Sequence, residues 1–60
     1  MILDFDCNHT KINSIARSLE EIRNLDGIIG IPTLELEQAE INRIVMYAEE
    51  NWIQIIGLER

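Results

Sequence analysis

The stretch that decides the expected fold is residues 37–57, EQAEINRIVMYAEENWIQIIG, because its apolar residues recur at helical spacing. They lie three or four positions apart and would form one stripe about 120° wide on a helix. The stripe consists of Ile41, Ile44, Val45, Ala48, Trp52, Ile55 and Ile56. Gly57 follows the stripe, where a left-handed C-terminal cap belongs. The pattern therefore predicts a single helix over residues 38–56, with Trp52 as a packing residue of the core.

The same helix has a second apolar face. Ala39, Met46 and Ile53 are spaced seven apart and lie about 120° or more from the centre of the main stripe. A helix that is apolar on two sides is normally buried on two sides. We expect this face either to bind a second subunit or a target protein, or to be covered by another segment of the chain. The partner-binding candidates are Ala39, Met46, Tyr47, Glu49, Glu50 and Ile53, with the two glutamates as a polar rim.

Residues 10–25 show a similar but shorter helical pattern. Their apolar positions are Ile12, Ile15, Ala16, Leu19 and Ile22. Gly27 follows and is expected to end this helix as a left-handed cap. Two amphipathic helices joined by a connection of this kind predict an antiparallel helical hairpin.

Two segments outside the helices have extended character. Residues 1–7 alternate between apolar and acidic side chains, which is typical of a short half-buried strand. Residues 28–36 are rich in β-branched side chains, and Pro32 excludes helix there. They are either two paired parallel strands or an extended cover over the helices. We therefore expect residues 1–60 to form a single, mainly α domain: a helical hairpin with short extended segments, completed as an oligomeric helical bundle.

The size and the cysteine content favour self-association. A chain of 60 residues buries only about 60% of the surface that it exposes when unfolded. Cys7 is the only cysteine, so no disulfide can form within the chain, and Cys7 and His9 fall short of the four ligands of a structural zinc site. A homodimer or higher oligomer is the remaining way to enlarge the core.

The net charge of −6, from eleven acidic and five basic residues, limits the partners. It argues against direct binding to nucleic acid or to anionic membranes, and it permits basic protein partners. The N-terminal residues carry no basic region, and no apolar run approaches transmembrane length. With an unpaired cysteine, these features predict a cytoplasmic protein.

No motif predicts a catalytic, cofactor-binding or metal site, so we expect no enzyme activity. The expected function is protein–protein interaction, as an inhibitor, adaptor or regulatory subunit that occludes a partner. Two alternatives stay open. One is a nucleic-acid mimic that inhibits a DNA- or RNA-binding enzyme, such as a phage anti-defence protein. The other is a sponge for small molecules at an oligomer interface.

Residues 27–38, especially TLELEQ at 33–38, carry a further resemblance. They resemble the linker and the start of the second helix in the Spo0E-like aspartyl-phosphate phosphatases, whose signature is Ser-Gln followed closely by Leu-Asp. Gln38 matches, but Glu37 stands in place of the Ser, and Glu40-Ile41 in place of Leu-Asp. The resemblance implies a two-helix hairpin that binds a response regulator. Because the key carboxylate is missing, it implies a binder and not a phosphatase.

Overall fold

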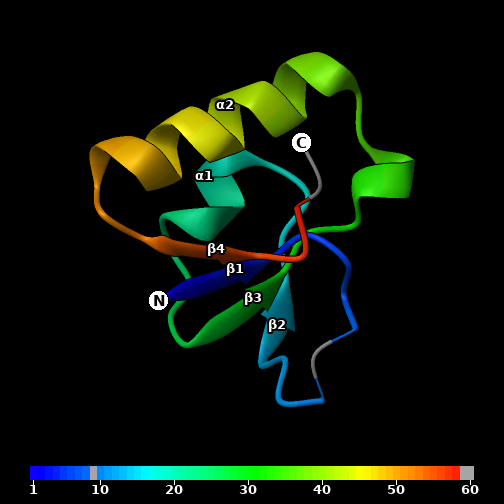
Figure 1. Cartoon of the computed structure of the whole chain (residues 1–60), viewed down its shortest axis with the longest axis vertical. Coiled ribbons are helices and arrows are strands. Elements are labelled where there is room, and N and C mark those ends of the chain that lie inside the picture. Colours follow the sequence, from blue (N-terminus) through cyan, green and yellow to red (C-terminus); the bar gives the residue numbers. More distant parts are fainter. Residues whose placement is uncertain (9, 59–60) are drawn as a thin grey trace.

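Four short strands run in the same direction and form one sheet, in the order β2–β3–β1–β4 (Figure 1). The computed structural model describes residues 1–8 and 10–58. Its elements are β1 (Ile2–Asp4), β2 (Ser14–Ile15), α1 (Leu19–Ile22), β3 (Ile28–Gly30), the 3-10 turn η1 (Thr33–Glu35), α2 (Gln38–Glu50) and β4 (Gln54–Ile56). The fold is therefore α/β, with one main helix.

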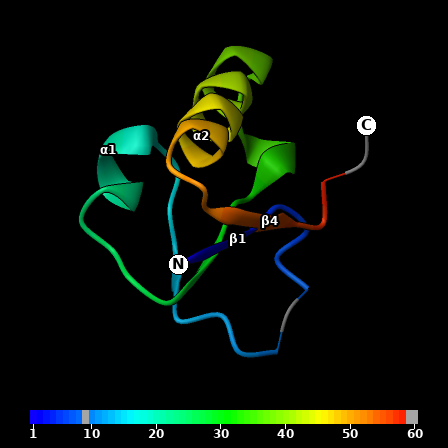
Figure 2. The same cartoon turned by 60° about the vertical axis from the view of Figure 1, so that its left-hand side comes forward.

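Both helices cover the same face of the sheet (Figure 2). Leu3 of β1 pairs in register with Ile29 of β3 and with Ile55 of β4, so these side chains share one face. They pack against the helices around a core made of Leu3, Phe5, Ala16, Ile22, Ile29, Ile31, Ile44 and Ala48. The buried residues of α2 are Ile44 and Ala48, one turn apart. The molecule thus has two layers, with its core between helices and sheet.

The opposite face of the sheet is covered only in part. Cys7 and Ile12 lie against β3, and a Cβ added at Gly30 would lie 3.1 Å from the Cys7 sulfur and 3.3 Å from Ile12 Cδ1. Gly30 therefore lets these two side chains pack closely on the strand. Farther along the same face, Ile2 and Ile28 are only half-buried.

The expected helix over residues 10–25 is wrong, because only Leu19–Ile22 is helical. Asn13 donates its amide to the carbonyl of Ile28 (2.8 Å), and its side-chain oxygen accepts from the Ile28 amide (2.8 Å). The β-branched and Asn/Ser-rich segment before residue 18 has low helix propensity, so pairing with β3 prevails. Ser18 then begins α1, and its hydroxyl accepts from the Glu21 amide (3.3 Å).

The expected helix over residues 38–56 is correct at its start and wrong at its end. It begins at Gln38 but stops at Glu50, and the β-branched run that follows becomes β4. The amide of Ile53 donates to the carbonyl of Ala48 (2.9 Å), and the amide of Trp52 to that of Glu49 (3.5 Å). This pair of bonds is a Schellman ending, five residues before the cap expected at Gly57.

The mainly α helical hairpin is therefore wrong, and so is a helical bundle built from it. The two-helix hairpin implied by the Spo0E-like resemblance is wrong for the same reason. The parallel pairing of the N-terminal segment with residues 28–36 is present, as β1 beside β3. No helix among the described residues is long and apolar enough to cross a membrane.

Candidate functional site

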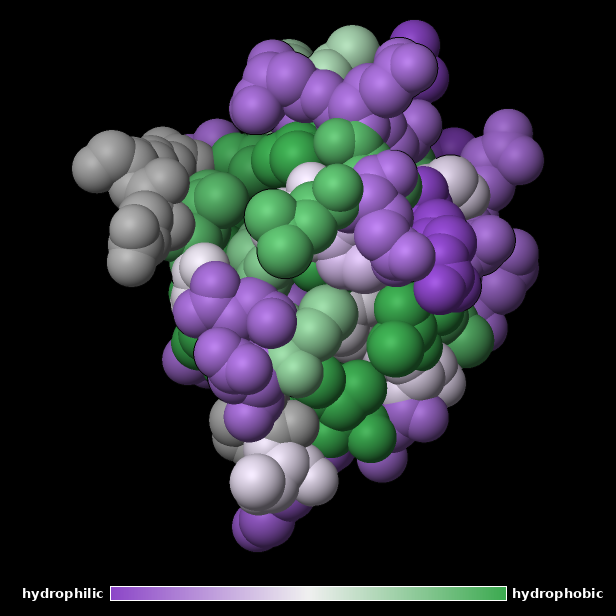
Figure 3. Space-filling model, turned by 90° about the vertical axis from the view of Figure 1, so that its right-hand side faces the viewer, coloured by the Kyte–Doolittle hydropathy of each residue, from purple (hydrophilic) through white to green (hydrophobic). Residues whose placement is uncertain are grey.

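The loops that follow β1, β3 and β4 meet at the carboxyl ends of the strands. Ligands of open parallel sheets usually bind at this edge. Figure 3 faces the edge and shows hydrophobic surface between hydrophilic patches. The loops are tied together by backbone bonds: the amide of Ile31 donates to the carbonyl of Asp4 (2.7 Å), and that of Phe5 to Ile56 (2.9 Å).

An open, mainly apolar hollow of about 260 Å³ lies at this edge, and we call it the carboxyl-edge pocket. It is lined by Phe5, Asp6, Cys7, Ile31, Pro32, Thr33, Leu34 and Glu35. The Thr33 hydroxyl donates to the carbonyl of Phe5 (3.2 Å), which fixes η1 against the end of β1. Leu34 lies on the rim and is fully exposed, at 102% of its reference area. An apolar hollow and an exposed leucine thus occur together on one surface.

Charges of both signs surround the pocket. Arg17 and Glu35 form an ion pair with 3.6 Å between Nη2 and Oε2, and both side chains are more than half exposed. Partial burial raises the pKa of the Cys7 thiol, and the carboxylates of Asp4, Glu35 and Asp6 raise it further, against the opposing effect of Arg17. The thiol therefore keeps its proton at neutral pH and is a weak nucleophile.

Asp4 is the one buried charged residue among those described, at 2% exposure. Its Oδ1 accepts from the Asp6 amide at 3.0 Å. Gly57, with a φ of 76°, lies close by, and a Cβ there would come within 2.9 Å of Asp4 Oδ1 and 2.8 Å of the Asp6 nitrogen. This buried carboxylate shapes the loop after β1, and Gly57 makes room for it.

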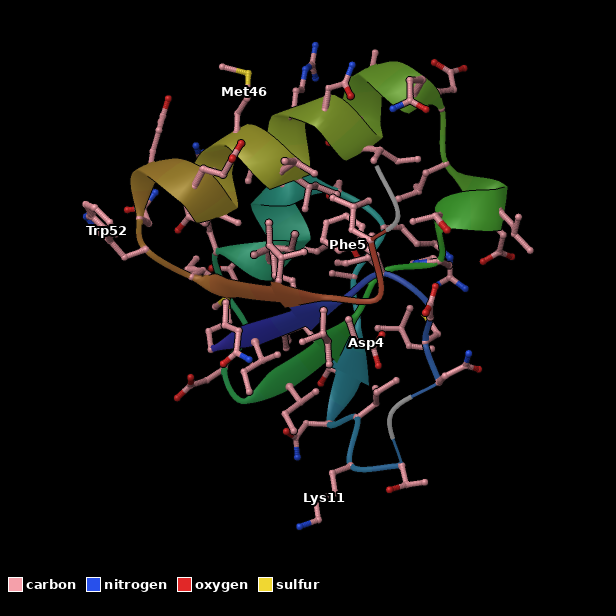
Figure 4. The ribbon with its side chains drawn as sticks, viewed as in Figure 1. Asp4, Phe5, Lys11, Met46 and Trp52 are labelled. Atoms are coloured by element: carbon pink, nitrogen blue, oxygen red, sulfur yellow. The ribbon has the colours of Figure 1, made fainter. Side chains whose placement is uncertain are left out.

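A second region lies at the carboxyl-terminal end of α2. Trp52 is 94% exposed and has a φ of 58°. It occupies the left-handed position of the Schellman ending, which glycine usually holds because side chains there clash with the backbone. Figure 4 shows the indole pointing away from the body of the molecule. Neither burial nor backbone conformation favours a tryptophan at this place.

The charges at this end of α2 are also unfavourable for the helix. Glu49 and Glu50 lie in its last turn, which contains no basic residue. The carboxyl end of a helix carries a partial negative charge, so carboxylates there are destabilising. We call Met46, Glu49, Glu50 and Trp52 the α2-end surface.

The residues expected to bind a partner are spread over α2 and the turn after it. Ala39 and Met46 lie on the exposed side of the helix, Met46 at 59% exposure. Tyr47 is half-buried, with the Arg23 guanidinium carbon 5.5 Å from its ring centre. Ile53 lies beyond the end of α2 and packs against the core, so it does not continue a seam with the other two. Glu49 and Glu50 are exposed beside Trp52. Partner binding by the six residues stays a prediction.

The expectation that Trp52 packs in the core is wrong, because the helix ends before it. The carboxyl-edge pocket was also missed, since the helices expected over residues 10–25 and 38–56 left at most a two-stranded parallel pair as the sheet. A signal for the first error was available: the β-branched run at residues 53–56 favours a strand.

A second hollow, of about 370 Å³, lies between α1 and the first half of α2. It is polar and lined by residues of both signs, including Arg43 and Glu40, whose Nη1 and Oε1 are 3.8 Å apart. Glu40 Oε2 also accepts from the Leu19 amide (3.3 Å), so this carboxylate joins α1 to α2. No group of three or more potential metal ligands comes together among residues 1–8 and 10–58, and His9 lies outside them.

Comparison of the chain with known protein families, curated proteins and solved structures gives no significant match.

Proposed function

We propose that the protein is a small acidic interaction module that binds a positively charged site on a partner protein through the α2-end surface. The observation that carries the proposal is Trp52, almost fully exposed in a conformation that suits glycine. Strained residues that the fold itself does not need tend to occur at functional sites. Tryptophan is also the residue type most enriched among the dominant contacts of protein interfaces.

The chemistry of the partner follows from the neighbours of Trp52. Glu49 and Glu50 precede it, and Met46 lies one turn before Glu50 on the same side of the helix. An Arg or Lys side chain stacked on the indole would gain a cation–π contact and could pair with a carboxylate. Met46 would contribute an adaptable apolar contact.

Binding at this surface would also relieve two unfavourable features of the free protein. A cationic partner neutralises the Glu50 carboxylate, which lies at the negative end of the helix. A covered indole no longer exposes its apolar area to water. We propose that the protein acts by occluding its partner, and that it acts in the cytoplasm, where an unpaired thiol such as Cys7 stays reduced.

The test uses Trp52 as its own reporter, because it is the only tryptophan of the chain. A synthetic peptide of alternating Arg and Leu is titrated into the protein while indole emission is recorded. We expect the emission to shift to shorter wavelength as the ring leaves water, and the affinity to fall as salt rises. An emission that stays that of an exposed indole would contradict the proposal.

A matched pair of variants separates this surface from the general negative charge. Glu49→Gln with Glu50→Gln removes two charges beside Trp52, and Glu20→Gln with Glu37→Gln removes two exposed charges elsewhere. We expect the first pair to weaken peptide binding about tenfold or more, and the second pair to change it by about twofold or less. Equal losses in both pairs would show that only the net charge attracts the peptide. The nucleic-acid-mimic alternative is tested by adding nucleic acid, which would compete with the protein for the peptide.

A further inference from the structure

We infer that the carboxyl-edge pocket is an interface between two copies of this chain, in which Leu34 of each copy enters the pocket of the other. This inference is independent of the α2-end surface and its basic partner. It rests on a protrusion and a hollow that share one surface.

The apolar geometry is self-complementary. Leu34 protrudes fully from η1, and the hollow beside it has Phe5 and Ile31, both buried, at its base. A two-fold axis beside Leu34 would bring each leucine over the hollow of the other copy. Such an isologous contact needs both parts on the same patch, which is the arrangement present here. An unrelated partner would need only one of them.

The charges of the patch favour the same occupant. The Arg17–Glu35 pair is exposed, so each copy offers a cation and an anion next to the hollow, and Asp6 adds a second exposed carboxylate to its lining. A two-fold arrangement can place Arg17 of one copy near Glu35 of the other without leaving either unpaired. The charged residues of the α2-end surface, Glu49 and Glu50, are both acidic, so this surface would repel its own copy.

The position of the patch supports a role outside the core. Thr33 anchors η1 to Phe5, so the exposure of Leu34 is held by the fold and not by a loose loop. A small domain gains most from association, because its own core is limited. Covering Leu34 and the hollow would remove apolar surface from water at this edge of the sheet, where Figure 3 shows hydrophobic side chains.

Sedimentation of the purified protein from about 1 µM to about 1 mM tests the inference. We expect a particle of twice the chain mass of 7.0 kDa at high concentration, dissociating on dilution. Leu34→Glu should weaken the dimer at least about 30-fold, the loss expected of a dominant interface residue. Since Leu34 is fully exposed, the variant should keep the far-ultraviolet spectrum and unfolding midpoint of the monomer.

Trp52→Glu is the matched control, because it also replaces an almost fully exposed large apolar side chain by glutamate. It should leave the dissociation constant of the dimer unchanged within about twofold. A protein that stays monomeric throughout, or a dimer weakened by Trp52→Glu and not by Leu34→Glu, would overturn the inference.

A cross-link tests the reciprocal geometry directly. Leu34→Cys places a thiol on the protruding residue, and Cys7, the only native cysteine, lines the hollow. Oxidation by dissolved oxygen removes one proton and one electron from each thiol and joins the two sulfurs. When light and 15N-labelled chains are mixed, we expect about half of the disulfide-linked peptides to combine the two isotopes, the statistical share for bonds between copies. Linked peptides of one isotope only, or no bond to Cys7 at a pH high enough to ionise its thiol, would contradict the inference.

Discussion

Leu34 and Trp52 are the two most exposed large apolar side chains of the described chain, and their surroundings differ in every respect. Leu34 lies on a 3-10 turn, beside an apolar hollow and an ion pair that has both signs. Trp52 has a left-handed backbone and follows two glutamates at the negative end of a helix. A surface that contains its own complement suits a second copy, whereas a strained surface of one sign suits a partner of the opposite charge.

The largest effect is expected where both regions depend on the same core. Ile44 is fully buried between α2 and the sheet, and Ile44→Ala should lower the free energy of unfolding by about 2–5 kcal/mol. A domain of this size is stabilised by only about 3–9 kcal/mol in total. Urea unfolding followed by circular dichroism measures the loss. Dimerisation and peptide binding should decline together; the loss of one alone would show that the regions do not share this core.

Gly57→Ala is expected to impair the carboxyl-edge pocket and to leave the α2-end surface intact. Its positive φ and its approach to the Asp6 nitrogen should reduce the free energy of unfolding by about 1–3 kcal/mol. The loop after β1 must shift, so the dimer should weaken while Trp52 still reports peptide binding. Gly27→Ala, with a φ of 86° at the other edge of the sheet, is the control that should lose stability without loss of the dimer. Equal weakening of the dimer by both changes would argue against a role for the loop after β1.

Glu50→Gln should have a smaller effect, with opposite signs for folding and binding. Removing a negative charge from the last turn of α2 should raise the free energy of unfolding by about 0.3–1 kcal/mol at low salt. The same change should weaken binding of the cationic peptide. Glu37→Gln, at the N-cap of the same helix, should do the reverse for stability. Thermal unfolding at two salt concentrations distinguishes the pair, and a loss of stability on Glu50→Gln would contradict the dipole argument.

The smallest effect concerns Cys7 and high pH. Because the pKa of the thiol is higher in the folded than in the unfolded protein, the folded state holds its proton more tightly. This contribution to stability is complete below about pH 8 and is lost as the pH rises through the folded-state pKa. The free energies of unfolding of the protein and of Cys7→Ser should differ by a constant amount near neutral pH. This difference should become smaller as the pH rises into the alkaline range. Parallel pH profiles would exclude a role of the thiol.

The sequence predicted the start of α2 and the extended character of residues 1–7 and 28–36, because local patterns determine these features, whereas the parallel pairing of the two segments was only one of two alternatives. It did not predict β2 or β4. The apolar residues of both segments fit a helical period, and strand pairing over long sequence distances overrode that period. The left-handed turn at Trp52 contains no glycine, so the sequence has no helix-stop residue at the end of α2. Because the helix was expected to continue to residue 56, Trp52 was assigned to the core and β4 was missing from the expected sheet.

The central claim is that Trp52 serves binding at the expense of folding, and Trp52→Gly tests it most directly. Its free energy of unfolding should be measured in the Leu34→Glu background, so that self-association does not contribute. Relief of the left-handed strain should raise it by about 1 kcal/mol and the melting temperature by about 4–8 °C, while binding of the Arg-Leu peptide, followed by calorimetry, is lost. A variant that is less stable than its parent, or that binds the peptide as well, would contradict the account.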